Sequence, residues 1–309
     1  MGFEVLYGND DRQEIKHLEE LQLYAKRVAE NAKAVCMLVH EDALRDEGNG
    51  FSRLITQKLH VVMRERFKIP LSKDEPYRDQ PRPTVSNVCS AFLVGKREIA
   101  TAMHCLKNQG VYVPVEKLRV VFDFKVENSD EISVYFNNDT QIYRITKKID
   151  GIVGRRLRHP DWALFQLDRD TNRSPLVLEK NNEVSEGAPV YVIGHPMALP
   201  MKFADNANVY LFKDCRYSRH YFRADLDTYG GNSGSPVFHA KTHSVIGILV
   251  AGGQDFMTFQ HPNGQTRIQS IQTEPDEARK EIIQRIKPVR ISLAKYNNSH
   301  ISQISHLNL

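Results

Sequence analysis

The spacing of apolar residues changes along the chain, from helical near the start to strand-like in the middle. Between about residues 10 and 36, apolar side chains recur every three or four positions, which predicts an amphipathic helix. A second stripe with the same spacing covers residues 51–67, after a glycine-containing break at residues 47–50. Residues 70–83 contain four prolines and many charges, which favours an extended linker over the surface. Two helices and a linker are therefore predicted ahead of the main domain.

After residue 83 the pattern becomes one of short apolar runs separated by turn residues. We predict strands at residues 89–94, 98–102, 118–126, 132–136, 142–147, 162–167, 189–193, 209–212, 236–238 and 244–250. Many short strands at hairpin spacing are typical of a β-sandwich or a β-barrel. Near the end, residues 273–277 read Thr-Glu-Pro-Asp-Glu, an N-cap with proline in the first turn, which predicts a helix through about Ile286 and a polar tail after it.

Composition narrows the class of protein further. The 309 residues allow two domains, or one large β domain with an appendage. Hydrophobic residues make up 41%, charged residues 26%, and the mean hydropathy is -0.46, values of an ordinary globular protein. The sequence has no apolar run near the roughly 18 residues of a membrane span, so no membrane partner is expected. The net charge of +4 is spread without a dense basic tract, so a nucleic-acid partner is not expected either.

The cysteines and histidines give no sign of a metal site. The four cysteines are Cys36, Cys89, Cys105 and Cys215. None of them forms a C-x-x-C pair, so a structural zinc site is not expected. Three histidines in the amino-terminal part, His17, His40 and His60, are not spaced as metal ligands, and we expect them to be solvated. No metal and no cofactor are therefore implied by the sequence.

Three short motifs carry residues suited to nucleophilic catalysis. His104 ends an apolar run, Asp161 follows His-Pro at the start of a predicted strand, and Ser233 lies in Gly-Gly-Asn-Ser-Gly-Ser-Pro. A serine can attack at neutral pH when an imidazole takes its proton and a carboxylate fixes that imidazole. The glycines around Ser233 suit a tight turn whose N–H groups stabilise an oxyanion, and Gly231 and Ser233 are the expected donors. Each motif also occurs in proteins without catalysis, but the three together in one β-rich chain favour a triad.

These motifs make the sequence resemble the trypsin-like serine proteases, in particular their bacterial V8-like, glutamyl-endopeptidase-like branch. The resemblance covers about residues 84–272 and is carried by residues 227–238, residues 245–248 and the Thr-Ala-x-His-Cys element with the Phe-Leu-Val-Gly before it. It implies a mainly β fold, a double six-stranded antiparallel β-barrel of the chymotrypsin type. The active site would then lie between the barrels, with Ser233 as nucleophile, His104 as general base and acid, and Asp161 as orienting carboxylate.

The resemblance also implies an organisation of the chain. Residues 1–83 would form an amino-terminal helical extension and linker, residues 84–272 the protease domain, and residues 273–309 a carboxyl-terminal helix and tail. The extension could be a pro-segment that keeps a zymogen inactive, a permanent brace on the barrels, or a docking surface. Met103 stands where many members have a small residue, and we expect its side chain to point into the barrel. His195 follows a strand, and we expect a structural role there, with a substrate-loop role as the alternative.

In the related enzymes a disulfide lies beside the catalytic histidine, and the resemblance implies such a bridge between Cys89 and Cys105. Two reduced, buried thiols are the alternative, and Cys36 and Cys215 are expected to be free. A bridge and the family together indicate export from a bacterium, to the periplasm or the medium. The start of the chain does not read as a signal segment, so we expect any such segment to be absent from this chain.

The residues expected to contact the substrate side chain before the scissile bond (P1) are Asp227, Thr228, Leu249 and Gly252. Thr228 matches a threonine of the glutamate-specific enzymes, but Leu249 stands where those enzymes have a histidine and cannot bind a carboxylate. Asp227 stands where trypsin-type members hold a P1 lysine or arginine, although it could instead cap a turn or pair with Arg223. Gly252 leaves room for a large side chain. We expect P1 Lys, Arg or a large apolar residue over P1 Glu.

Two functions follow. The first is a monomeric serine endopeptidase that acts on proteins or peptides through Ser233, His104 and Asp161. The alternative is a catalytically silent protease-fold module that binds a peptide or protein and is held closed by its amino-terminal helices. Covalent labelling of Ser233 separates the two.

Overall fold

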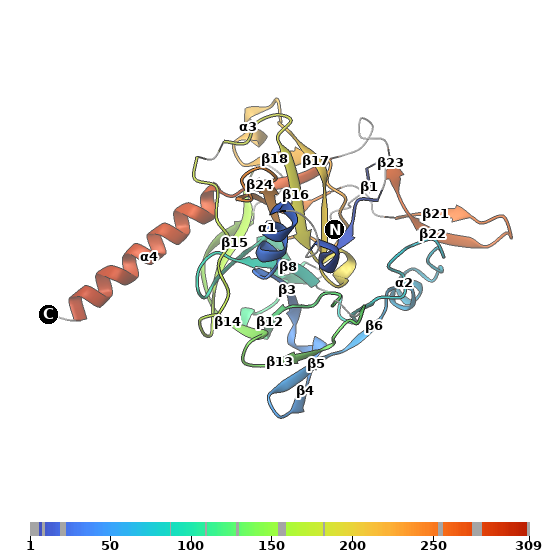
Figure 1. Ribbon diagram of the computed structural model, residues 1–309, viewed down its shortest axis with the longest axis horizontal. Helices are drawn as coiled ribbons and strands as arrows, with labels where there is room; N and C mark the ends of the chain where they lie inside the picture. The colour runs from blue at the N-terminus through green and yellow to red at the C-terminus, as the bar shows by residue number, and fades with distance from the viewer. Residues whose placement is uncertain are drawn as a thin grey trace.

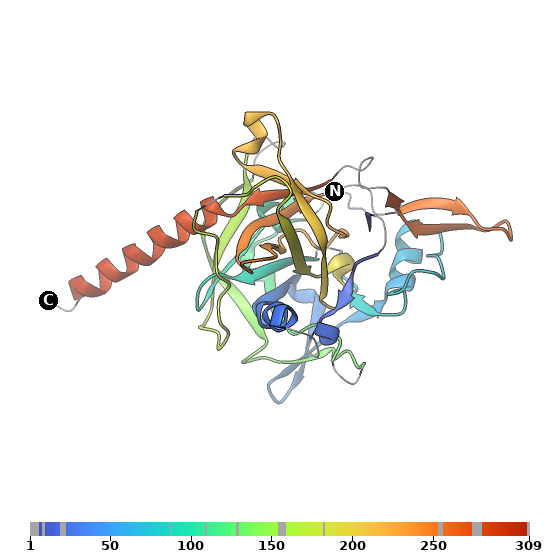
Figure 2. The same cartoon turned by 45° about the horizontal axis from the view of Figure 1, so that its top comes forward.

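The computed structural model describes residues 6–7, 10–18, 23–86, 88–108, 110–127, 130–153, 159–181, 183–252, 256–273 and 280–307. Most of the described chain forms two β-barrels, and the chain ends in a long helix, α4 (Lys287–Leu307), that projects away from them (Figure 1). A hairpin of β21 (Phe256–Gln260) and β22 (Thr266–Ser270) projects on the other side of the molecule (Figure 2). Among the described helices, none has the length and apolar composition of a membrane span.

Six antiparallel strands close the first barrel in the order β12-β14-β15-β9-β8-β3. They are β3 (Val35–His40), β8 (Val88–Leu93), β9 (Glu98–Thr101), β12 (Leu118–Phe122), β14 (Ile142–Val153) and β15 (Asp161–Leu167). Their inward side chains, among them Phe92, Ile99 and Phe165, are fully buried in one apolar core. This burial of aromatic and branched side chains favours closure of the sheet into a barrel.

The second barrel follows in the chain. Its strands run in the order β16-β19-β20-β24-β18-β17, and pairing of β16 with β17 closes the ring. They are β16 (Pro189–Gly194), β17 (Lys202–Tyr210), β18 (Tyr221–Ala224), β19 (Pro236–His239), β20 (Val245–Ala251) and β24 (Glu281–Arg285). A short strand near the start of the chain, β2 (Gln13–Glu14), adds to the outer edge of β17. The expected mainly β fold with two six-stranded antiparallel barrels is thus confirmed.

The prediction of one helix over residues 10–36 is wrong. A short 3-10 turn, η1 (Ile15–Leu18), comes first, and the helix itself, α1, spans only Leu23–Ala32. Val35–His40 forms β3, the strand of the first barrel that pairs with both β8 and β12. All but the last residue of β3 are buried, so it appears in the sequence as a continuous apolar run, which spacing alone does not distinguish from buried helix. The first barrel therefore includes a strand that precedes residue 84.

The second predicted helix is also shorter than expected. Phe51–Leu54 forms β5 and Thr56–Lys58 forms β6, and only Leu59–Phe67 is helical, as α2. The predicted linker is not merely a surface crossing, because its end, β7 (Pro81–Pro83), pairs with β6 and Arg82 is buried.

The prediction of a helix over residues 273–286 is wrong for the part of this range that the structure describes. Residues 281–285 form β24, which lies between β18 and β20 in the second barrel, and residues 274–279 lie outside the described residues. The supposed tail forms α4 instead. Because this buried strand contains glutamate and glutamine, it lacks the alternation of apolar and polar residues that predicts a strand. The N-cap sequence before it therefore favoured a helix.

The other described elements are short and lie around the barrels. They are β1 (Leu6–Tyr7), η2 (Glu41–Ala43), β4 (Leu44–Gly48), η3 (Met103–Leu106), β10 (Lys107–Asn108), β11 (Val111–Tyr112), η4 (Val115–Lys117), β13 (Tyr135–Asn137), η5 (Pro196–Ala198), α3 (Cys215–Ser218) and β23 (Gln272–Thr273).

Candidate active site

His104 and Asp161 meet at neighbouring strand ends of the first barrel. His104 lies in η3, just after β9, and Asp161 is the first residue of β15, which pairs with β9. Asp161 Oδ2 lies 2.7 Å from His104 Nδ1, and Asp161 Oδ1 accepts the His104 backbone N–H at 3.1 Å. One carboxylate therefore holds both the ring and its backbone. With a proton on Nδ1, the lone pair of Nε2 is left for base catalysis.

The backbone of Asp161 is itself held by the second barrel. Its N–H donates to Gln284 Oε1 at 2.8 Å, and Gln284 Nε2 donates to the carbonyl of His220 at 3.1 Å. Gln284 is fully buried on β24. Sequence reasoning missed Gln284 because it lies in the segment that was predicted to be a helix.

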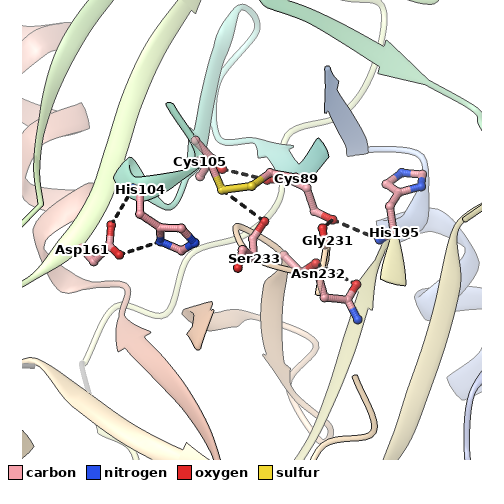
Figure 3. Close-up of a disulfide and its surroundings, with 11 residues drawn as sticks. Cys89, His104, Cys105, Asp161, His195, Gly231, Asn232 and Ser233 are labelled. Atoms are coloured by element: carbon pink, nitrogen blue, oxygen red, sulfur yellow. Dashed lines mark hydrogen bonds and ion pairs between the residues drawn. A yellow bond between two sulfur atoms is a disulfide. The ribbon is translucent and has the colours of Figure 1, made fainter. Parts of the chain in front are cut away.

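Ser233 comes from the loop between β18 and β19 of the second barrel. In Figure 3 the imidazole of His104 lies between Asp161 and Ser233. The three motifs, separated by 57 and 72 positions in the sequence, are thus brought together by strand ends of one barrel and a loop of the other.

The turn before Ser233 is built for exposed backbone N–H groups. Gly231 has φ +106, and a Cβ there would lie 2.8 Å from the His195 carbonyl oxygen. The Gly230 carbonyl accepts the Met197 N–H at 2.7 Å. Because C=O and N–H of a trans peptide point in opposite directions, the Gly231 N–H points away from Met197. Within the described ranges, neither the Gly231 N–H nor the Ser233 N–H donates to a protein acceptor.

Ser90 ties this turn to the first barrel. Its N–H donates to the Ser233 carbonyl at 2.9 Å, and its Oγ donates to the Gly231 carbonyl at 3.1 Å. Ser90 Oγ also accepts the His195 N–H at 3.0 Å. Ser90 is fully buried within the apolar strand β8, and this polar residue in an apolar run was the signal that sequence reasoning did not use.

Cys89 and Cys105 form a disulfide, with their Cα atoms 6.0 Å apart (Figure 3). It joins β8 to η3 and so flanks both Ser90 and His104. Cys105 Sγ lies 3.5 Å from the Ser233 carbonyl oxygen, a contact and not a hydrogen bond, since a disulfide sulfur carries no proton. The two sulfurs and His104 lie close enough together for a metal site, but bonded sulfurs offer no thiolates.

Two other residues singled out by the sequence lie in the interior. Met103 packs into the core of the first barrel. His195 is fully buried, with Nδ1 3.0 Å from the Leu199 carbonyl oxygen and its ring stacked on Phe124. Burial lowers the pKa of His195 to about 4, and the neutral imidazole is part of the packing beside Gly231. Cys36 is buried and Cys215 exposed, both as free thiols.

The four predicted P1-contact residues have different surroundings. Asp227 and Thr228 are buried in the loop before Gly231, and Asp227 Oδ2 accepts the Asp11 N–H at 2.8 Å. The Arg223 guanidinium lies over the Phe212 ring, with Cζ 4.8 Å from the ring centre. Leu249 belongs to the core of the second barrel, while its backbone bonds hold the Gly234–Ser235 turn.

Gly252 has an acidic neighbour that sequence reasoning did not identify. The carboxylate of Glu281 lies directly against Gly252 and leaves no room for a Cβ there. Glu281 is fully buried at the start of β24. Asp227 and Glu281 therefore place two carboxyl groups among the residues around the predicted P1 site.

Comparison with known proteins agrees with this architecture. The trypsin-like peptidase domain matches residues 89–248, more than half of the chain. The structure of a Glu endopeptidase in complex with MPD has a TM-score of 0.50 at 13% identity, covering 96% of this chain and 100% of that one. Vibrio cholerae VesB protease has a TM-score of 0.51 at 12% identity, covering 94% of this chain and 68% of that one. At such identity the likeness concerns the fold alone.

No protein with a curated function matches the sequence. The domain match nevertheless includes strands of both barrels, from Cys89 in β8 to Ile248 in β20. On that match and the two closed barrels, the chain belongs to the trypsin-like peptidase family and is a peptidase.

Proposed function

We propose that the protein is a serine endopeptidase whose catalytic triad is Ser233, His104 and Asp161. The observation that carries the proposal is the double contact of Asp161 with the ring and backbone of His104, at 2.7 Å and 3.1 Å. This contact fixes the ring and its tautomer, as a general base next to a serine nucleophile requires.

The reaction follows from that arrangement. Ser233 Oγ attacks the carbonyl carbon of the scissile peptide and gives its proton to His104 Nε2. The N–H groups of Gly231 and Ser233 bind the oxyanion of the tetrahedral intermediate. Collapse of the intermediate breaks the C–N bond, and His104 gives the proton to the leaving amine. Water then hydrolyses the acyl-enzyme, with His104 again as base and acid.

The exposure of His104 is evidence against the alternative function, a catalytically silent binding module held closed by its amino-terminal helices. The side chain is 34% exposed, so the amino-terminal helices do not cover it. Helix α1 packs against the second barrel instead. There Asn31 Nδ2 donates a hydrogen bond to the Tyr191 hydroxyl at 3.0 Å, and Tyr24 packs edge-on against the Tyr191 ring. The Gly230 carbonyl also points to Met197 and leaves the proposed oxyanion site open.

For P1 we propose Lys, Arg or a large apolar residue, in preference to Glu. Asp227 and Glu281 are buried carboxyl groups near the proposed site, and both would repel a third one. The Leu249 side chain lies in the barrel core and offers no hydrogen bond to a P1 carboxylate. The same charges would favour a P1 cation.

We further propose that the enzyme belongs to the bacterial V8-like branch and is exported to the periplasm or the medium. The bridge between Cys89 and Cys105 supports export, because disulfides persist in oxidising compartments.

Intact-mass analysis after treatment with a fluorophosphonate tests the triad. The wild-type chain is expected to gain a single adduct, and Ser233→Ala none. Asp161→Asn is expected to keep the fold and label at least about a hundredfold more slowly, because the imidazole loses the group that fixes its tautomer. A wild-type chain that gains no adduct, folded and with its disulfide intact, would support the silent binding module.

A P1-randomised peptide library tests the specificity. Cleavage after Lys, Arg or large apolar residues is expected, and Glu281→Gln should shift the profile away from Lys and Arg. A library cleaved mainly after Glu would refute the P1 proposal and leave the triad proposal standing.

A further inference from the structure

The segment at residues 10–14 lies against the loop that leads into the nucleophile turn. The Asp11 N–H donates to Asp227 Oδ2 at 2.8 Å, and Asp227 is 3% exposed. Two residues further on, β2 pairs with β17 of the second barrel. The segment at residues 10–14 is thus hydrogen-bonded to Asp227, one of the residues proposed to surround the P1 side chain.

Arg12 fills the space between this segment and the loop. Its side chain is 1% exposed, with Cζ 4.2 Å from the centre of the Tyr229 ring and 4.8 Å from that of Tyr77. A guanidinium between two aromatic rings gains cation–π attraction, and more so when desolvated. Tyr229 is fully buried two residues before Gly231.

Two carboxylates hold the charge of Arg12. Asp10 binds it in two places, Nε to Oδ1 at 2.8 Å and Nη2 to Oδ2 at 2.6 Å, and Glu75 Oε1 lies 3.2 Å from Nη2. Bidentate pairing fixes the plane of the guanidinium as well as its place. The Tyr77 hydroxyl donates to the Arg12 carbonyl at 2.7 Å, so the backbone is held too.

A second buried ion pair holds the end of the same segment. Lys202 Nζ lies 2.9 Å from Glu14 Oε1, and Gln80 Nε2 donates to Glu14 Oε1 at 2.8 Å. Lys202 is on β17, while Glu75, Tyr77 and Gln80 come from the stretch between α2 and β7. Three parts of the chain that are far apart in sequence therefore meet around Arg12. Removal of one partner of a buried ion pair leaves an unpaired buried charge, which costs free energy. These pairs therefore argue against easy detachment of residues 10–14 from the barrels.

We propose that Arg12 is a positioning residue for substrate recognition, which holds Tyr229 and thereby the Asp227–Tyr229 loop beside the P1 side chain. Residues 10–14 are then a built-in part of the active site and not a pro-segment that is removed on activation. This inference rests on the proposed function and, for residues 10–14, argues against the pro-segment role that the sequence left open.

Replacing the guanidinium tests the role of Arg12 directly. In Arg12→Met the half-buried Asp10 and the buried Glu75 lose their cation, and Tyr229 loses its stacking partner. We expect KM for a good peptide substrate to rise about tenfold or more and selectivity among P1 residues to weaken. The rate of fluorophosphonate labelling, which does not depend on a P1 side chain, should fall no more than about threefold.

Two further variants keep the test decisive. Arg12→Lys retains the charge without the planar fork, so it should fold and show a smaller rise in KM. Arg45→Met, which removes an arginine that is 67% exposed and 4.0 Å from Glu47, is the matched control and should behave as wild type. Thermal unfolding checks that each variant is folded.

The outcomes separate the two proposals. A folded Arg12→Met variant with the KM and P1 profile of wild type would overturn the role of Arg12. A wild-type chain that reacts with the fluorophosphonate only after residues 1–14 have been cut away would overturn it as well and identify the segment as a pro-segment. A chain that never reacts, cut or uncut, would refute the serine protease proposal, and this inference with it.

Discussion

Gly234, next to the nucleophile, occupies a place that only glycine fits. Its φ is +90, and a Cβ would collide with the Ser90 carbonyl oxygen and Thr101 Oγ1. Gly234→Ala is therefore expected to displace the turn, lowering the labelling rate of Ser233 by about a hundredfold and the free energy of unfolding by about 2 kcal/mol or more. Labelling kinetics and urea unfolding measure both.

Gly264, in the turn between β21 and β22, provides the matched control. It has φ +81, but a Cβ there would meet no atom within 4 Å. Gly264→Ala should cost about 1 kcal/mol from backbone strain alone and leave labelling unchanged. Equal effects of the two substitutions on labelling would contradict the role assigned to the contact between Gly234 and Ser90.

At this scale the sequence predicted the residues with the clearest chemistry. A histidine, an aspartate and a serine in glycine-rich or strand-end motifs are recognisable without coordinates. The roles of Ser90, Gln284 and Glu281 were not predictable. The role of a buried serine, glutamine or glutamate depends on the residue that it contacts, and that residue is distant in the sequence. Gln284 and the Asp161 N–H that it accepts are 123 positions apart.

At the scale of elements, the N-cap of η5 is a buried neutral histidine that makes the free energy of unfolding depend on pH. This N-cap is His195, and burial lowers the pKa of His195 from 6.5 to about 4. Between these values the unfolded chain binds a proton that the folded chain does not. The contribution of His195 to the free energy of unfolding is therefore complete above about pH 6.5 and falls as the pH drops toward 4, by about 1.4 kcal/mol per unit.

His195→Gln checks this expectation, because glutamine does not titrate. The variant is expected to be less stable than wild type near pH 7, and the difference between the two should shrink as the pH falls toward 4. Urea unfolding at several pH values gives the comparison. A difference that stays constant from pH 7 to pH 4 would contradict the assignment.

At the same scale, β3 and β24 show why some elements were misread. Each belongs to a barrel but lies outside the stretch of short strands that the sequence displays. β3 is apolar except for its last residue, His40, and follows a helix in the sequence, whereas β24 carries buried polar residues. A strand is recognised in a sequence when apolar and polar residues alternate, because one face of the strand is buried and the other is exposed. β3 and β24 do not show this alternation.

For the molecule as a whole, the disulfide links β8 to η3 on the first-barrel side of the candidate site. Cys89 and Cys105 are 16 positions apart, a loop for which a bridge stabilises by about 3 kcal/mol through the unfolded chain. Cys89→Ser is therefore expected to lower the melting temperature by several degrees and to reduce activity first at elevated temperature. Cys215→Ser, which removes an exposed free thiol, should leave both unchanged. Thermal unfolding with and without reductant measures the effect, and equal melting temperatures for Cys89→Ser and wild type would contradict it.

The sequence by itself determined the β-rich character of the chain, the order of the three motifs and the residue types available for catalysis, because these depend on local spacing and chemistry. Only the tertiary structure decided how they are supported. The bond from Asp161 to Gln284, the grip of Ser90 on the nucleophile turn and the insertion of Arg12 beside Tyr229 all join positions far apart in sequence. Such pairs leave no local periodicity, since the free energy that fixes them comes from burying polar and charged groups together, which happens only when the barrels close.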